Sequence, residues 1–273
     1  MLKQRVITAL ILAPLVMMAV LLLPTVYVAA FLALVVAVGG REWARLSGIQ
    51  VPGLQLLYAL LMVVAMLVSY VSIPESWIPW VLGLSVLWWC TALYRLTRFQ
   101  SEQVSDQFAP IQALEGFLVL LPAWIALVAL HRVPHFGPGL LLFVLILIWS
   151  ADVGAYFAGH RWGQHKLAPQ VSPGKTREGV YGAMASAVLC GVFLVWWLDI
   201  SLVSAPLVLL LCLVTMMLSV VGDLFESLLK RQRGMKDSGT LLPGHGGMLD
   251  RIDSLTAAAP VFVFGLSLLG KIS

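Results

Sequence analysis

Charged residues are scarce in this chain. Of its 273 residues, 11% are Asp, Glu, Lys or Arg and 60% are hydrophobic, whereas an ordinary soluble domain carries about a quarter charged residues. The 17 basic and 13 acidic side chains are too few to cover a soluble globule of this length. This scarcity excludes a soluble globular domain, and the apolar content excludes a disordered or nucleic-acid-binding chain. The remaining class is a polytopic membrane protein.

Cysteine is scarce as well. The three cysteines, Cys90, Cys190 and Cys212, lie far apart in apolar runs, and no Cys-x-x-Cys pair suggests a metal or redox site. Three cysteines also exclude a secreted disulfide scaffold. The net charge of +4 then indicates basic loops beside an anionic membrane leaflet, and we expect no nucleic-acid partner.

Long apolar runs recur along the chain. A helix needs about 20 residues to cross the ~30 Å hydrocarbon core of a bilayer. We therefore predict an all-α, polytopic integral membrane protein with about nine transmembrane helices in one membrane-embedded unit, 1–273. The continuity of the runs excludes a β-barrel, whose strands alternate apolar and polar residues. The predicted spans are 6–24, 25–40, 53–73, 76–94, 109–130, 137–158, 179–198, 203–224 and 255–270.

The basic residues divide unequally between the two sides of these spans. If the N-terminus is cytoplasmic, 15 of the 17 basic residues fall on the cytoplasmic side, which is the distribution that membrane proteins favour. Loops 159–178 and 225–254 are then cytoplasmic, and loop 131–139 lies outside. We interpret His131 and His135, in that outer loop, as solvated residues.

Two predicted spans contain carboxylates, which cost several kcal/mol inside a bilayer. Asp152 lies near the cytoplasmic end of the sixth span, and Asp223 and Glu226 near that of the eighth. A carboxylate paired with a lysine at the interface is the simpler interpretation of Asp152. We expect residues 1–131 to form a scaffold of helices, and 137–273 to hold the catalytic helices and loops.

The segment after Asp223 carries the chemistry of a phosphate site. On a helix, Asp223 and Ser227 are i,i+4 neighbours, and Asp250 and Asp253 are i,i+3 neighbours. Three such carboxylates form a hard-oxygen set suited to Mg²⁺. Basic side chains and glycines that bind anions lie between them: Lys230, Arg231, Lys236, His245, Gly239, Gly244, Gly246 and Gly247. The pattern favours phosphoryl or nucleotidyl transfer at a membrane surface, and a solvated connector is the alternative.

A second segment, Pro-Gly-Lys-Thr at 173–176, resembles the end of a P-loop. The motif needs glycine where this chain has Pro169, and we expect no β-strand before it, so we exclude a P-loop. Ser172, Lys175 and Thr176 can still donate hydrogen bonds to a phosphate without a P-loop.

Two stretches resemble the phosphatidate cytidylyltransferases, also called CDP-diacylglycerol synthases. The first is Ser227-Leu-Leu-Lys230-Arg231-x₄-Lys236-Asp237-x-Gly239-x₂-Leu242-Pro243-x-His245-Gly246-Gly247-Met248-x-Asp250-Arg251-x-Asp253. The second is Asp152-Val-Gly-Ala-Tyr156-x₂-Gly159, followed by Leu167-x-Pro169-x-Val-Ser172-Pro173-x-Lys175-Thr176-x-Glu178-Gly179. Length and multispanning organisation agree over nearly the whole chain.

The resemblance implies that CTP and phosphatidate react to give CDP-diacylglycerol and pyrophosphate. It also implies Mg²⁺ with a second cation such as K⁺, a homodimer, and a bacterial inner membrane with the active site on the cytoplasmic face. We assign Asp223, Asp250 and Asp253 to the metal, and Asp152 and Tyr156 to the lipid or nucleotide cavity. The residues assigned to substrate phosphates, or expected beside them, are Lys230, Arg231, Lys236, Ser172, Lys175, Thr176, Ser227, His245, Gly246, Gly247 and Arg251.

Two alternatives to this function remain. A CTP-dependent polyprenol-type lipid kinase would also need CTP and a metal at a membrane face, although the 227–253 signature favours cytidylyl transfer. An ion-coupled transporter could use Asp152, Asp223 and Glu226 as a relay. Transporters keep such residues near the bilayer midplane, whereas these lie at the ends of spans.

Overall fold

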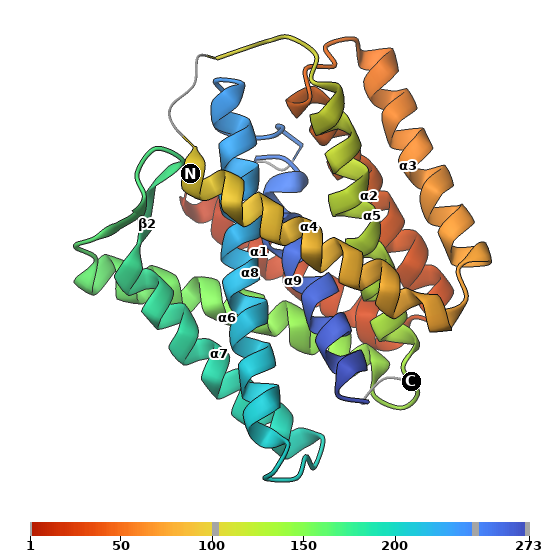
Figure 1. Cartoon of the computed structure of the whole chain (residues 1–273), viewed down its shortest axis with the longest axis vertical. Coiled ribbons are helices and arrows are strands. Elements are labelled where there is room, and N and C mark those ends of the chain that lie inside the picture. The colour runs from red at the N-terminus through yellow and green to blue at the C-terminus, as the bar shows by residue number, and fades with distance from the viewer. Residues whose placement is uncertain (1, 100–103, 242–245, 271–273) are drawn as a thin grey trace.

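The computed structural model describes residues 2–99, 104–241 and 246–270, and helices dominate it (Figure 1). The prediction of an all-α polytopic membrane protein is confirmed, since eight helices among the described residues are long and apolar enough to cross a membrane. The exact number of crossings and the orientation stay predictions. The elements are α1 (Leu2–Leu22), α2 (Thr25–Leu46), α3 (Pro52–Ser72), η1 (Glu75–Trp77), α4 (Ile78–Arg98), α5 (Pro110–Arg132), α6 (Gly137–Trp162), β1 (Lys166–Ala168), β2 (Ser172–Thr176), α7 (Arg177–Trp197), α8 (Ala205–Gln232) and α9 (Leu249–Leu268).

Proline marks where many of these helices begin. It occupies the first or second position of α3, α4, α5, α6 and α8. A helix leaves its first N–H groups without partners inside the helix, so a residue that lacks the N–H group costs little there. The prolines thus set the starts of the helices after short connections.

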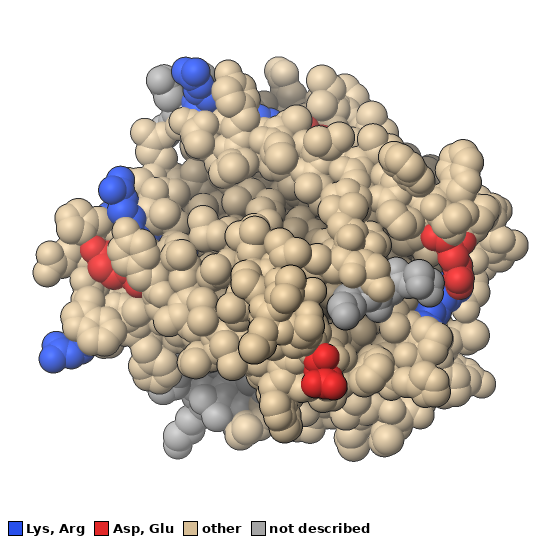
Figure 2. Space-filling view, turned by 60° about the horizontal axis from the view of Figure 1, so that its bottom comes forward, with Lys and Arg blue, Asp and Glu red and all other residues tan. Residues whose placement is uncertain are grey.

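Helices α5 and α9 form the centre of the bundle. In the most apolar part of each, 67% and 56% of the residues are buried, against 22% in the span that includes α4 and 28% in α7. Ala257, Ala258 and Ala259 of α9 are fully buried, and such small side chains let neighbouring helices approach closely. The outer helices present apolar side chains to their surroundings, and Figure 2 shows a face with few charged residues.

Helices α6, α7, α8 and α9 pack in sequence order, with the connection between α6 and α7 lying beside α8 (Figure 1). That connection is a small antiparallel hairpin of β1 and β2. The expectation that no strand precedes residues 173–176 is therefore wrong, because these residues lie on β2 itself. They are extended rather than looped, so the exclusion of a P-loop still stands.

His131 corrects a second expectation, because it is buried rather than solvated. Its Nδ1 lies 2.9 Å from Thr25 Oγ1, and its Nε2 lies 2.9 Å from the carbonyl oxygen of Val20. The ring thereby ties the α1–α2 turn to the end of α5. His135, in the connection between α5 and α6, is exposed as expected.

The orientation can be tested by labelling with a membrane-impermeant thiol reagent. In a variant that lacks Cys90, Cys190 and Cys212, we expect Ser201→Cys to react in intact cells and Lys166→Cys to react only after permeabilisation. Both positions are exposed, and the 15-of-17 distribution of basic residues predicts opposite sides for them. Labelling of Lys166→Cys in intact cells would reverse the topology.

Candidate active site

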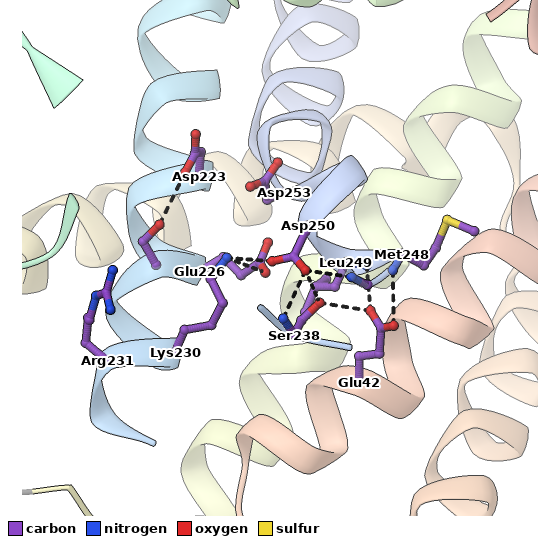
Figure 3. Close-up of polar contacts among 12 residues, drawn as sticks. Glu42, Asp223, Glu226, Lys230, Arg231, Ser238, Met248, Leu249, Asp250 and Asp253 are labelled. Carbon is purple, nitrogen blue, oxygen red and sulfur yellow. Dashed lines mark hydrogen bonds and ion pairs between the residues drawn. The ribbon is translucent and has the colours of Figure 1, made fainter. Parts of the chain in front are cut away.

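The first group of candidate residues lies where α8 and α9 pack together (Figure 3). Asp223 and Glu226 are on α8, and Asp250 and Asp253 are near the start of α9. The close approach of the two helices depends on Gly222. A Cβ atom at this position would lie 2.5 Å from the carbonyl oxygen of Asp253, so any larger residue would push the helices apart.

The second group comes from the hairpin and meets the first at Asp223. Lys175 Nζ on β2 lies 2.6 Å from Asp223 Oδ2, and both side chains are about 70% buried, with 27% and 30% exposed. Ser227 Oγ donates to Asp223 Oδ1 at 3.3 Å. Asp152 of α6 interacts electrostatically with Asp223, Lys175 and Arg251. The structure therefore brings together segments that two helices separate in the sequence.

A cavity of about 390 Å³ lies beside this meeting point, between α6, α7, β2 and α8. Asp152, Tyr156, Lys175 and Thr176 supply polar groups to its lining, and most of the other lining residues are apolar. Tyr156 is exposed and stacks on His160, with 5.9 Å between the ring centroids. The cavity is thus charged where it meets the Lys175–Asp223 pair and largely apolar elsewhere.

The Asp250 side chain points away from Asp223 and contacts other protein groups (Figure 3). Its Oδ1 lies 2.6 Å from Lys230 Nζ, which lies 3.2 Å from Glu226 Oε1. Its Oδ2 accepts from the backbone N–H groups of Ser238 at 2.9 Å and Gly247 at 2.8 Å. Lys230 is buried between two carboxylates. In this arrangement, therefore, Asp250 and Lys230 bind each other.

Asp223 and Asp253 are the carboxylates that face the same space between α8 and α9, and they interact electrostatically (Figure 3). Among the residues that the structure describes, no three His, Cys, Asp or Glu side chains gather to hold a metal ion. The donor chemistry nevertheless fits Mg²⁺, because carboxylates outnumber the nearby cations. The carboxylates are Asp152, Asp223, Glu226, Asp250 and Asp253, and the cations are Lys175, Lys230 and Arg251. Asp250 as a third metal ligand stays a prediction.

The remaining predicted phosphate ligands occupy varied positions. Thr176 is buried, and its hydroxyl oxygen accepts from Gly179 N at 3.1 Å, which caps the start of α7. Arg231 Nε donates to the carbonyl oxygen of Val171 at 3.1 Å, so α8 also contacts the hairpin turn. Ser172 lies half-buried on β2. The exposed residues are Arg231, Lys236 and Arg251, and His245 lies outside the described residues. Their roles toward phosphate stay predictions.

Glu42, which the sequence reasoning did not select, lies next to this network. It is on α2 and is 9% exposed, and its carboxylate accepts from Ser238 Oγ at 3.0 Å, Met248 N at 3.1 Å and Leu249 N at 2.7 Å. The sequence would have given a signal for it only with a longer second span, because acidic residues are rare inside membrane-spanning helices. Glu42 fell just beyond the predicted span 25–40, whereas α2 continues to Leu46.

This fold and these contacts define a polytopic membrane protein with a polar site of carboxylates and basic groups at one end of its bundle. The chain belongs to the cytidylyltransferase family, whose model matches residues 3–269. The chain is 44% identical over 263 residues to a protein of Pseudomonas aeruginosa named phosphatidate cytidylyltransferase, with 96% of each chain covered. It is 36% identical to a Haemophilus influenzae protein of the same name, with 97% of this chain and 98% of the relative covered. The resemblance stated from the sequence is confirmed.

Proposed function

We propose that this protein transfers the cytidylyl group of CTP to phosphatidate, forming CDP-diacylglycerol and pyrophosphate. The observation that carries the proposal is the 44% identity, over 96% of both chains, to a protein named for this activity. The site supports it, because the Lys175–Asp223 contact joins the two segments that carry phosphate-binding residue types.

In this reaction, an oxygen of the phosphatidate phosphate attacks the α-phosphorus of CTP. A new P–O bond forms, the bond from the α-phosphorus to the bridging oxygen breaks, and pyrophosphate leaves. A phosphomonoester is already an anion at neutral pH, so no strong base is needed. The difficulty is to bring two polyanions together, and the positive charges of Lys175 and Arg251, both of which interact electrostatically with Asp152, would offset their repulsion if the phosphates bind beside them.

The chain offers Asp223 and Asp253 as the residues that would hold Mg²⁺. When bound, Mg²⁺ would supply positive charge to the reacting phosphates. Lys175 holds one oxygen of Asp223 at 2.6 Å, and Ser227 donates to the other, so both groups fix the orientation of that carboxylate. A second cation such as K⁺ and a homodimer stay expectations from the family.

The cavity beside Lys175 suits a substrate with one charged end and one apolar end. Ala151, Ala155, Val180 and Val220 form part of its apolar lining, and Lys175 marks its charged end. We propose that phosphatidate enters here with its phosphate toward Lys175. We also propose that the protein lies in the bacterial inner membrane with this end facing the cytoplasm, as the basic residues indicate.

The direct test supplies purified protein with CTP, phosphatidate and Mg²⁺. We expect CDP-diacylglycerol and pyrophosphate as products. A parallel reaction with a polyprenol in place of phosphatidate tests the lipid kinase, which would form a phosphorylated lipid and CDP. Recovery of unchanged CTP and phosphatidate would contradict the cytidylyltransferase, and unchanged CTP in both reactions would contradict the kinase as well.

Lys175 tests the part that the hairpin plays. Replacing it by glutamine should lower the rate about 10²-fold, because one electrostatic contact to the reacting groups is lost. Lys175→Arg should retain part of the activity, because it keeps the charge but not the compact ammonium. Lys166→Gln, an exposed residue on the other strand of the same hairpin, is the matched control and should be near normal. Near-normal kinetics for Lys175→Gln, across CTP and phosphatidate concentrations, would remove the hairpin from the active site.

A further inference from the structure

Helix α9 begins without a cap from its own segment. Its N-cap residue is Met248, and no side-chain hydrogen bond caps the helix locally. The first N–H groups of a helix have no partners inside that helix. Here Met248 N and Leu249 N donate to the two oxygens of Glu42, so a carboxylate from 206 positions earlier in the chain receives them.

The charge of Glu42 is balanced by this arrangement. Burial of a carboxylate is costly unless hydrogen bonds satisfy its oxygens. Glu42 receives two backbone N–H groups and one hydroxyl, and it lies at the positive end of the α9 dipole, which favours an anion. The interaction therefore depends on where α9 starts, and a shift of α9 would leave a buried charge poorly solvated.

Ser238 extends the contact from Glu42 to Asp250 (Figure 3). Its Oγ lies 3.0 Å from Glu42 Oε2 and 3.0 Å from Asp250 Oδ2. A hydroxyl has one proton, so it donates fully to one carboxylate at a time. Asp250 in turn holds Lys230. A continuous chain of contacts thus runs from α2 through Ser238 to α9 and α8.

Two glycines make room for Glu42. A Cβ atom on Gly247 would lie 2.5 Å from Glu42 Oε2, and one on Gly239 would collide with Glu42 Oε1. These glycines were expected to let backbone approach an anion. In the structure, the anion that they admit is the side-chain carboxylate of Glu42.

We propose that Glu42 is a positioning residue for cytidylyl transfer, which sets the start of α9 and thereby the placement of Asp250 and Asp253. This inference rests on the proposed function. Glu42 itself is not among the residues that line the substrate cavity, so it acts through the residues it holds. The N-terminal helices would then take part in building the site rather than only supporting it.

The test compares Glu42→Gln with Glu75→Gln, an exposed carboxylate of η1 that serves as the matched control. The amide that replaces the Glu42 carboxylate cannot accept at both ends, so one backbone N–H group loses its partner. We expect kcat per folded protein to fall about 10–100-fold, the range for a small displacement of catalytic groups. The Mg²⁺ concentration that gives the half-maximal rate should rise, while KM for phosphatidate should stay within about 2-fold. A loss of stability alone would lower the folded fraction and leave that Mg²⁺ concentration unchanged, which would contradict the proposal.

Hydrogen exchange of the segment 246–250 gives a readout that does not need activity. Faster exchange in Glu42→Gln than in the wild type, with Glu75→Gln unchanged, is the expected result. Unchanged exchange and unchanged kcat would overturn the proposal even if the wild type makes CDP-diacylglycerol. If the wild type makes none, the proposed function fails, and exchange alone decides whether Glu42 holds α9. Should Glu42→Gln not fold, Ser238→Ala keeps both contacts of Glu42 to α9, and normal kinetics in that variant would count against the Ser238 link.

Discussion

Replacing Asp223 by asparagine is expected to lower the rate of CDP-diacylglycerol formation about 10²–10³-fold while the protein stays folded. Asp223 lies where the hairpin meets α8, in contact with Lys175 and Ser227 and facing Asp253. Asparagine keeps the shape but removes the charge that would hold a metal ion. It also leaves Lys175 without its anionic partner, so two groups of the site change at once.

The control for this variant is Asp199→Asn, at the other end of the bundle. Asp199 is exposed and has a φ angle of 48°, a conformation that asparagine tolerates well. We expect normal rates and normal thermal unfolding in this control. Initial rates over a range of Mg²⁺ concentrations, with unfolding measured in the same detergent, make the comparison. A near-wild-type rate for Asp223→Asn would exclude Asp223 from the reaction centre.

Among these substitutions, Asp250→Asn should lower the free energy of unfolding the most. Asp250 accepts from Lys230, Ser238 and Gly247, and the Lys230–Asp250 pair is about 90% buried. An amide would place a donor against existing donors and leave the lysine charge poorly paired. Breaking a buried ion pair costs about 3–5 kcal/mol. At about 2–4 °C per kcal/mol, the midpoint of thermal unfolding should fall by roughly 6–20 °C.

Asp253→Asn is the contrasting variant, three residues further along the same helix. In the wild type, the Asp253 carboxylate accepts from the backbone N–H of the next residue, Ser254, at 2.7 Å and otherwise faces Asp223. We expect the rate to fall about 10²-fold with little change in thermal unfolding. Unfolding curves and rates per folded protein separate the two effects. Equal unfolding midpoints for Asp250→Asn and the wild type would show that its hydrogen bonds do not hold the site.

The sequence by itself determined the class of protein and which segments share one end of it. Hydropathy adds up over about 20 neighbouring residues, and a helix satisfies its own backbone hydrogen bonds, so spans can be predicted from local sequence. The order of spans then places loops 159–178 and 225–254 on the same side, where the structure joins Lys175 to Asp223. The ends of spans were less predictable, because α2 and α8 continue beyond their apolar runs to Leu46 and Gln232.

Only the tertiary structure decided which partner each polar side chain takes. Helical spacing predicted that Asp250 and Asp253 project together, yet Asp250 turns to Ser238 and Lys230 while Asp253 faces Asp223. Nothing in local sequence pairs Glu42 with Met248 and Leu249, or His131 with Val20. A buried polar group must find a partner wherever the fold provides one. Its choice therefore depends on contacts between distant segments, which spacing along the chain does not encode.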